Sequence, residues 1–447
     1  MRQISLAFII LLVAACGSDG DGGLTAPPDA GNCGASGQKQ YVWDAMNDWY
    51  LWNDRLPATI NLGDFASAEA LLDELVKSRP ATDSVGNPIR RFSFINSAVA
   101  DSQFFGEGKY EGYGFGRRYV DPGFTEMRLL YVYADSPAFR ADFRRGHRVV
   151  ALNDRSIADI NAAEGVDAVL ASPPVKFTME DVDGNSYERV VDIDIVTIDP
   201  IPEWKIIAAS GGRSVGYLEL TTFISTAEPQ FEDAFAAFKA ANVSEIIIDL
   251  RYNGGGLVDT AELLGDYLGS FANAGSVFSK TSFNADRAPA NNSTELFETR
   301  NSAVNLSRLV VIASRSSASA SELVTNSLAA WVPVGIVGDD TFGKPVGQVG
   351  LVFCDKILRP TSFQTVNALD FGDYYGGLPA DCEASDDLSV ETGDAADPNM
   401  VAAMQWLETG ACAVASAPAG QQKLQLNSES PRPDLSGPAH RVYAGAY

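Results

Sequence analysis

The chain has 447 residues, of which 46% are hydrophobic, and its formal net charge is −25. This length is enough for several domains, and the acidic balance argues against nucleic acid as a partner, because phosphate binding needs a basic surface. The same charge argues against electrostatic docking on anionic lipid. With 2 histidines and a cysteine spacing unlike that of zinc ribbons or fingers, we expect neither a metal site nor a cofactor.

Residues 1–16 have the pattern of a targeting segment. Arg2 supplies positive charge, and the apolar run Ile4 to Val13 is too short to span a bilayer as a stable helix. The sequence Val13-Ala14-Ala15-Cys16 resembles a bacterial lipobox, in which Cys16 is lipidated; an ordinary signal peptide or a chance cysteine is the alternative. Residues 17–37 predict a flexible linker. Gly17 favours the outer membrane, so we expect a lipid-anchored protein of the bacterial cell envelope, facing the periplasm or the cell surface.

The cysteines beyond Cys16 are even in number, which suggests two disulfides in an exported chain. Their spacing alone allows three pairings. We favour Cys354–Cys382 together with Cys33–Cys412, because Cys354 and Cys382 flank one irregular C-terminal segment.

Residues 38–105 predict a helical N-terminal domain. Apolar side chains recur at helical spacing, first from Val42 to Trp52 and then from Leu71 to Val76. The aromatic-rich DWYLW, residues 48–52, is better explained as packed core than as a carbohydrate-stacking surface.

Residues 106–200 predict a small domain of short strands, among them Leu129 to Tyr133. The domain resembles a PDZ domain, and the resemblance makes Tyr113-Gly114-Phe115-Gly116 its carboxylate-binding loop, where backbone N–H groups receive a peptide C-terminus. Gly146-His147 and Asn153-Asp154 depart from the usual PDZ turns, which puts peptide binding in doubt. The alternative is a β domain that only buttresses its neighbour.

Residues 201–412 alternate apolar strands with helices, the pattern of an α/β core. The predicted elements are strands at 215–220, 246–250, 309–313 and 334–337 and helices at 228–241, 260–268, about 323–331 and 398–407. Residues 413–447 are rich in Ala, Ser, Pro and Gln and predict a poorly ordered tail.

Ser319, in the motif SASE, falls between a predicted strand and a predicted helix. Unpaired N–H groups at a helix start favour negative charge and suit an oxyanion. A serine hydroxyl needs an adjacent base, and both histidines, His147 and His440, are distant in sequence. Lys344, in the motif TFGK, has an apolar and compact setting that would lower its pKa.

Two further features bear on this site. Asp339 and Asp340 would raise the pKa of Lys344 if they approached it. The glycines of Asp249-Leu250-Arg251-Tyr252-Asn253-Gly254-Gly255-Gly256 suit a flexible turn or a phosphate cradle, but no Gly-Lys-Ser/Thr follows, so a P-loop is not supported.

SASE, TFGK and DLRYNGGG, in this order and spacing, resemble the motifs of the C-terminal processing peptidases, a serine protease family (S41). The resemblance implies that Ser319 is the nucleophile, Lys344 the general base, and Gln348 the residue that orients the lysine. It gives the oxyanion donors as the backbone N–H groups of Ala320 and Gly255, with Gly254 and Gly256 as rivals. It further implies a ClpP/crotonase-like α/β protease core and relates residues 38–105 to the helical domain of exported members. Asp249 and Arg251 are expected to fix the glycine loop.

The expected function is therefore that of a cell-envelope serine endopeptidase acting on protein or peptide substrates, held at the membrane only by its lipid anchor. The PDZ-like domain would recognise substrate C-termini. Related folds host CoA-thioester chemistry, but the serine, the lysine and export argue against it. The alternative is a catalytically silent peptide-binding scaffold lipoprotein; the oligomeric state is left open.

Overall fold

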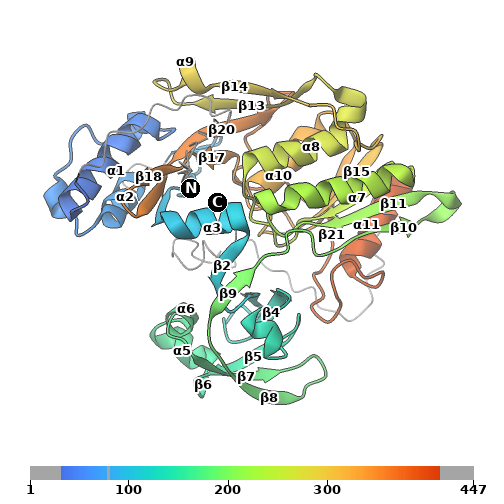
Figure 1. Cartoon of the computed structure of the whole chain (residues 1–447), viewed down its shortest axis with the longest axis horizontal. Helices are drawn as coiled ribbons and strands as arrows, with labels where there is room; N and C mark the ends of the chain where they lie inside the picture. Colours follow the sequence, from blue (N-terminus) through green and yellow to red (C-terminus); the bar gives the residue numbers. More distant parts are fainter. Residues whose placement is uncertain (1–31, 78–80, 413–447) are drawn as a thin grey trace, which may run out of the picture.

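A computed structural model describes residues 32–77 and 81–412. The predicted lipidation site Cys16 and the predicted tail lie outside the described residues. The described chain forms a helical N-terminal region, a small β domain and a large α/β core (Figure 1). The multidomain α/β fold with a helical N-terminal region is confirmed.

The helical region packs on a hairpin that comes from far along the chain. Its elements are α1 (Ala35–Trp49), η1 (Asn53–Arg55), η2 (Leu62–Asp64) and α2 (Ala68–Lys77). Trp49 and Leu71 are fully buried, and they share one apolar cluster with Leu358 from the hairpin of β18 (Leu351–Phe353) and β19 (Lys356–Arg359). Trp49 and Tyr50 are buried, as expected for core aromatics.

The N-terminal region is joined to the core by strand pairing. Strand β1 (Phe94–Ser97) pairs antiparallel with β19, with Phe94 opposite Arg359. Helix α3 (Ala98–Glu107) follows directly and leads to the small β domain. Residues 94–97 therefore form a strand within the range 38–105, which was predicted as a mostly helical domain.

The favoured disulfide pairing was wrong. The bonds are Cys33–Cys354, with a Cα–Cα distance of 5.7 Å, and Cys382–Cys412, at 5.3 Å. Because α1 buries its apolar face on the β18–β19 hairpin, Cys33 lies next to Cys354 and not next to Cys412. This packing between distant segments has no signal in the cysteine spacing.

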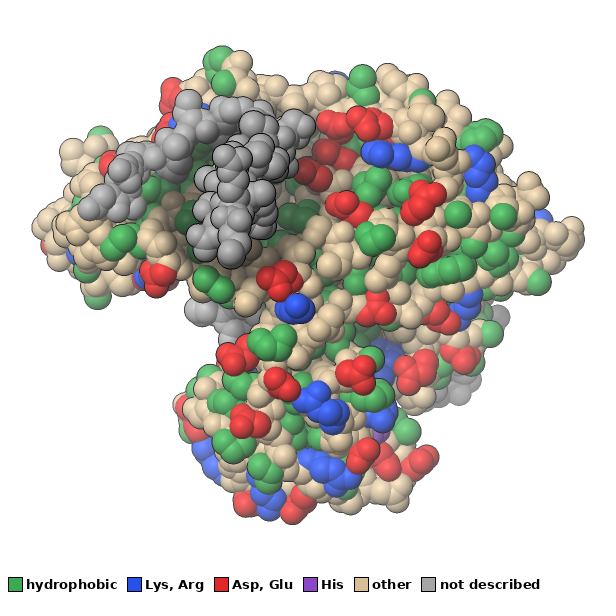
Figure 2. Space-filling view, viewed as in Figure 1, with side chains coloured by type: hydrophobic (Ala, Val, Ile, Leu, Met, Phe, Trp, Pro, Cys, Tyr) green, Lys and Arg blue, Asp and Glu red, His purple; other side chains and the backbone are tan. Residues whose placement is uncertain are grey.

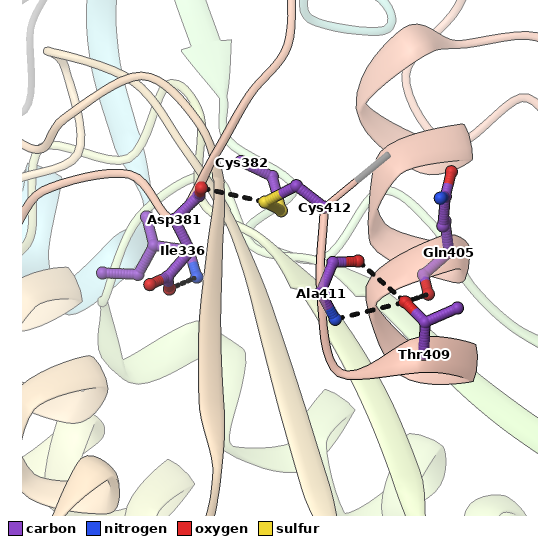
Figure 3. Close-up of a disulfide and its surroundings, with 7 residues drawn as sticks. All are labelled: Ile336, Asp381, Cys382, Gln405, Thr409, Ala411 and Cys412. Carbon is purple, nitrogen blue, oxygen red and sulfur yellow. Dashed lines mark hydrogen bonds between the residues drawn. A yellow bond between two sulfur atoms is a disulfide. The ribbon is translucent and has the colours of Figure 1, made fainter. Parts of the chain in front are cut away.

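The second disulfide closes the C-terminal part of the core (Figure 3). It joins β21 (Cys382–Glu383) to the residues just after α11 (Pro398–Thr409). Asp381, beside this disulfide, accepts a hydrogen bond from Ile336 N at 2.8 Å, which holds the segment against strand β16 (Val334–Gly338).

The small β domain forms the lower lobe in Figure 1. Its sheet has the order β3-β4-β5-β7-β8, with β6 paired to β5. Strands β2 and β9 pair with each other and carry the chain into and out of the domain. The elements are β2 (Lys109–Gly112), β3 (Phe115–Tyr119), β4 (Met127–Val132), α4 (Pro137–Arg140), β5 (Arg148–Leu152), β6 (Arg155–Ser156), α5 (Ile157–Ala163), α6 (Val166–Leu170), β7 (Val175–Glu180), β8 (Ser186–Val191) and β9 (Asp194–Thr197).

The core is built on a sheet of order β10-β11-β12-β15-β16-β21, in which only the β10–β11 pair is antiparallel. Every residue of β12 is buried, as expected for a parallel strand covered on both faces. Helices α7, α8 and α10 cover one face and α11 the other (Figure 1). The elements are β10 (Trp204–Ala208), η3 (Ser210–Gly212), β11 (Ser214–Glu219), η4 (Ser225–Ala227), α7 (Glu228–Ala240), β12 (Glu245–Asp249), α8 (Val258–Asn273), β15 (Arg308–Ala313) and α10 (Ala320–Ala329).

A second, antiparallel sheet of order β14-β13-β20-β17 lies on the other side of α10, which contacts both β13 and β20. Its strands are β13 (Val277–Phe283), β14 (Ser293–Leu296), β17 (Val346–Gln348) and β20 (Thr361–Asn367), with α9 (Ala288–Asn291) between the first two. Helix α10 is thus held between two sheets. Across residues 32–77 and 81–412, no helix is long and apolar enough to cross a membrane.

Candidate active site

Ser319 lies in the turn between β15 and α10. Its backbone has φ +55° and ψ −113°, a conformation that side-chain-bearing residues rarely adopt and that costs free energy. The residue is partly exposed, whereas Ala318 and Ala320 on either side are buried. The turn therefore presents one hydroxyl at the surface of a closely packed loop.

The glycine loop lies directly against this turn, because it follows β12, the parallel neighbour of β15. A Cβ atom added to Gly255 would lie 2.8 Å from Cβ of Ser319 and 3.0 Å from the backbone N of Ala320. Gly255 also has φ +107°, which disfavours any side chain. Only glycine permits this approach, so the two segments predicted to form the oxyanion hole do adjoin.

The choice among the three glycines stays a prediction. In this conformation the N–H of Gly255 donates a hydrogen bond of 2.8 Å to Oδ1 of Asn253. An oxyanion would have to share or replace that bond. Gly254 and Gly256 therefore remain rivals for the first donor.

Asn253 fixes the glycine loop to the nucleophile turn, a role that the sequence analysis did not assign. Its backbone oxygen accepts hydrogen bonds from Ala318 N at 3.1 Å and from Ser321 Oγ at 2.9 Å. Its side-chain amide donates to Leu220 O at 2.9 Å. Its place within DLRYNGGG is the one signal that the sequence offered.

Lys344 is 2% exposed, and its Nζ atom has no hydrogen-bond partner among the described residues. Burial and, to a smaller extent, the positive charge of Arg359 lower its pKa, and the carboxylate of Glu322 opposes them; together they bring the pKa to about 7. An amine with this pKa is neutral in about half of the molecules at pH 7, and the neutral form is a competent proton acceptor.

The backbone before Lys344 requires a glycine, and the two nearby aspartates are paired with an arginine. Gly343 has φ +96°, and a Cβ atom there would lie 2.3 Å from Tyr375 O. Asp339 and Asp340, which threatened to raise the pKa of Lys344, form ion pairs with Arg315 at 3.9 Å and 2.5 Å.

Gln348 is turned toward the N-terminal region. Its Nε2 atom donates a hydrogen bond of 2.9 Å to Phe92 O. Because Nζ of Lys344 lacks a partner within the described ranges, Gln348 makes no hydrogen bond to the amine in this conformation. Its orienting role stays a prediction.

Glu322 connects Ser319 to Lys344 through their backbones. Its fully buried carboxylate accepts hydrogen bonds from Ser319 N at 3.0 Å and from Lys344 N at 2.8 Å. It also accepts from Gly343 N at 2.7 Å and from Thr341 Oγ1 at 2.5 Å. Burial raises the pKa of Glu322, and because these hydrogen bonds offset only part of the rise, the pKa stays above its ordinary value. The pattern Ser-x-x-Glu in SASE is that of a helix-capping box, which could have marked Glu322 as a helix-capping residue. The pattern does not predict the hydrogen bond from Lys344 N.

Asp249 and Arg251 hold the base of the glycine loop, as expected. Nε of Arg251 donates to both carboxylate oxygens of Asp249 at 3.0 Å, and a second carboxylate, that of Asp397, pairs with the same guanidinium. All three side chains are buried. The guanidinium of Arg251 is bound by both carboxylates, so these three side chains have a structural role in holding the loop.

The glycine loop also contacts the small β domain. Asp386 accepts hydrogen bonds from Tyr252 Oη at 2.7 Å and from Arg145 of the small domain at 2.6 Å. Arg118, on β3, forms an ion pair with the same carboxylate at 2.9 Å. A chain of charge-assisted bonds therefore joins this domain to the loop beside Ser319.

The predicted peptide-binding loop opens strand β3, which lies at an edge of its sheet. Tyr113 and Phe115 bury their side chains in the domain core. Gly114 has φ +88°, and a Cβ atom there would lie 2.1 Å from Cβ of Ser136, so glycine is required. Peptide binding at this edge stays a prediction.

The two histidines do not change this assignment. His147 lies in the small β domain, where Nδ1 hydrogen-bonds Tyr187 Oη at 2.6 Å, and His440 is outside the described residues.

Acidic side chains gather over α8 (Figure 2). Within the described ranges, no group of His, Cys, Asp or Glu is arranged to hold a metal ion.

Comparisons with known proteins agree with these motifs. Residues 214–367 match the model of peptidase family S41, and residues 37–94 match the peptidase S41 N-terminal domain. The chain is 23% identical over 362 residues to the carboxy-terminal processing protease CtpA of Bacillus subtilis (strain 168), covering 79% of this chain and 71% of that protein. It is 25% identical to the chloroplastic carboxyl-terminal-processing peptidase 3 of Arabidopsis thaliana, covering 66% of this chain and 56% of that protein.

Solved structures show the same fold. A putative S41 protease from Bacteroides fragilis NCTC 9343 superposes with a TM-score of 0.66 at 24% identity, covering 82% of this chain and 97% of that chain. The photosystem II D1 C-terminal processing protease gives a TM-score of 0.51 at 18% identity, covering 79% of this chain and 94% of that chain. Residues 37–94 and 214–367 thus match, in this order, the N-terminal domain and the peptidase domain of family S41, a family of serine-type peptidases.

Proposed function

We propose that the protein is an endopeptidase that uses Ser319 and Lys344 as a catalytic dyad. Oγ of Ser319 attacks the peptide carbonyl while the neutral amine of Lys344 takes its proton, and the resulting ammonium then protonates the leaving amine. In the second step the neutral amine of Lys344 takes a proton from water as the water oxygen attacks the acyl-enzyme, and the ammonium then returns the proton to Oγ of Ser319. Backbone N–H groups of Ala320 and Gly255 stabilise the oxyanion.

The observation that carries this proposal is the unpaired, buried amine of Lys344 with its pKa lowered to about 7. An unpaired buried amine costs stability, so its presence beside a strained serine turn calls for a chemical reason. Glu322, which binds the backbones of both residues, supports the pairing. Within the described residues Nζ of Lys344 has no hydrogen-bond partner, so the proposal requires Oγ of Ser319 to come within hydrogen-bonding distance of it during the reaction.

The finer assignments belong to the same proposal. The edge strand β3 receives the C-terminal residues of a substrate as an added strand, in the manner of a PDZ domain. Lipidation of Cys16 anchors the protein to the outer membrane, facing the periplasm or the cell surface. Gln348 turns toward Lys344 once the dyad is engaged.

The test is cleavage of an unfolded model protein by residues 17–447, compared with Ser319→Ala and Lys344→Ala. We expect wild type to cleave and both variants to lose nearly all turnover while remaining folded by circular dichroism. Loss in Ser319→Ala alone would assign the base to another residue. Peptide binding by a wild type that cleaves none of several substrates would instead favour the silent scaffold.

A further inference from the structure

The amine of Lys344 lies against a residue of the N-terminal region. The Phe92 ring has its centroid 5.9 Å from Nζ, and the same ring lies 6.4 Å from that of Phe342. Phe92 is partly exposed, whereas Lys344 and Phe342 are buried. The Phe92 ring therefore lies beside the buried amine, with part of its own surface exposed.

Strand pairing fixes Phe92 in this position. Its backbone oxygen accepts the hydrogen bond from Gln348, and two residues later Phe94 pairs with Arg359 on β19. Ser93 Oγ lies 3.1 Å from Thr361 Oγ1 and anchors the segment to β20. These contacts fix the backbone of Phe92 beside Lys344, so the ring can leave only by rotation of its own side chain.

We propose that Phe92 is a positioning residue that excludes water from the general base, so that the N-terminal domain completes the active site of the core. This inference rests on the proposed Ser319–Lys344 dyad and extends it. It gives the helical domain, which carries no catalytic motif, a role in the reaction: it holds an aromatic ring beside the buried amine.

The charged groups around the amine are few. Arg359 on β19 disfavours the ammonium form, and the carboxylate of Glu322 on α10 favours it. Arg359 is itself paired with Asp101 of α3 at 2.6 Å, and Arg90 lies over the Phe342 ring at 4.4 Å. None of these changes when Phe92 is truncated. Loss of the ring's attraction for the ammonium would lower the pKa of Lys344, so an upward shift would report its hydration.

The experiment measures the pH dependence of Ser319 labelling by a fluorophosphonate, in which Oγ bonds to phosphorus and fluoride leaves. The series is wild type, Phe92→Leu, Phe92→Val and Phe92→Ala, with Phe65→Ala as control, because Phe65 is a partly buried aromatic of the same domain, in the cluster of α1 and α2. Lost side-chain volume admits water, which raises the pKa of Lys344. We expect the acid limb of Phe92→Ala to move up by about one pH unit, a roughly tenfold loss below neutrality, with Phe92→Val between.

The alkaline plateau separates this role from a structural one. Since hydration changes only the neutral fraction of the amine, the Phe92→Ala plateau should stay within about twofold of wild type. Phe92→Leu should shift the limb least of the three Phe92 variants, and Phe65→Ala should keep the wild-type limb. An unchanged limb in folded Phe92→Ala or Phe92→Val, with or without a lower plateau, would overturn the inference and leave the dyad standing. Equal labelling of Ser319→Ala and wild type would overturn the dyad and this inference with it.

Discussion

Arg251 and Lys344 are both 2% exposed, yet the protein treats the two buried basic side chains in opposite ways. Arg251 is surrounded by the carboxylates of Asp249, Asp397 and Asp386, which hold its pKa above the ordinary range for arginine. Lys344 has no partner among the described residues, and its pKa falls to about 7. Because carboxylates surround it, the buried Arg251 stays charged and has a structural role. Because its amine is buried without a hydrogen-bond partner, Lys344 loses its proton more easily and can act as a base. The predictions below test that difference.

The largest effect is expected from Lys344→Ala. Because the amine is the proposed proton acceptor, kcat should fall by about 10²–10⁴-fold, as is usual for loss of a general base. The rate of peptide cleavage at pH 8 measures this. Arg251→Met, matched in burial, should retain more activity than Lys344→Ala wherever it remains folded; the reverse order would remove the distinction.

Arg251→Met should have the largest effect on stability. It leaves Asp249 and Asp397 as buried carboxylates without their cation, so the free energy of unfolding should fall by about 3–5 kcal/mol. Urea denaturation followed by tryptophan fluorescence measures the loss. A change below about 1 kcal/mol would mean that the cluster is already hydrated.

Glu322→Gln tests the carboxylate that binds the backbones of both catalytic candidates. The amide replaces one acceptor oxygen by a donor that faces two other donors, so the Ser319 and Lys344 segments should separate. We expect kcat to fall about 10–100-fold with little change in KM. Removing the negative charge should also lower the pKa of Lys344 and move the acid limb of the pH profile to lower pH. A higher KM with unchanged kcat would contradict a positioning role.

The smallest expected effect is a gain in stability from Lys344→Met. The folded-state pKa of Lys344, about 7, is below the ordinary lysine value of 10.5, so between these pH values the unfolded chain binds more protons than the folded chain. Lys344 therefore destabilises the fold most below pH 7, and the penalty disappears as pH rises toward 10.5. Lys344→Met should raise the free energy of unfolding by about 1–3 kcal/mol at pH 6 and by less at pH 9. Urea titrations at both pH values measure this, and a loss at pH 6 would refute it.

The sequence predicted the parts of the molecule whose signals are local. Period and composition predicted the strand that became β15, the helix that became α10 and the buried strand β12. SASE and TFGK pointed to Ser319 and Lys344 mainly because their order and spacing resemble the S41 peptidase motifs; a serine and a lysine in an apolar setting are compatible with that chemistry. The apolar residues around Lys344 likewise predicted a lowered pKa, the direction that the structure gives.

The contributions from distant segments had no such signal. Phe92 and Arg359 approach Lys344 because β1 pairs with β19, a register fixed by packing across the whole chain. Cys33 meets Cys354 for the same reason. Glu322 was visible as a helix cap, but its bond to Lys344 N depends on a turn that only the folded TFGK segment makes. Pairing between remote elements is what local periodicity leaves open.

The bond between Cys33 and Cys354 also decides how the protein bears mechanical load. A pull applied at Cys33 passes through the disulfide directly into the β18–β19 hairpin. Residues 34–353 form a covalently closed loop, so the tension bypasses α1, α2 and the segment that carries Phe92. An enzyme held from its amino-terminal side can thus be dragged without its lysine pocket being stretched open.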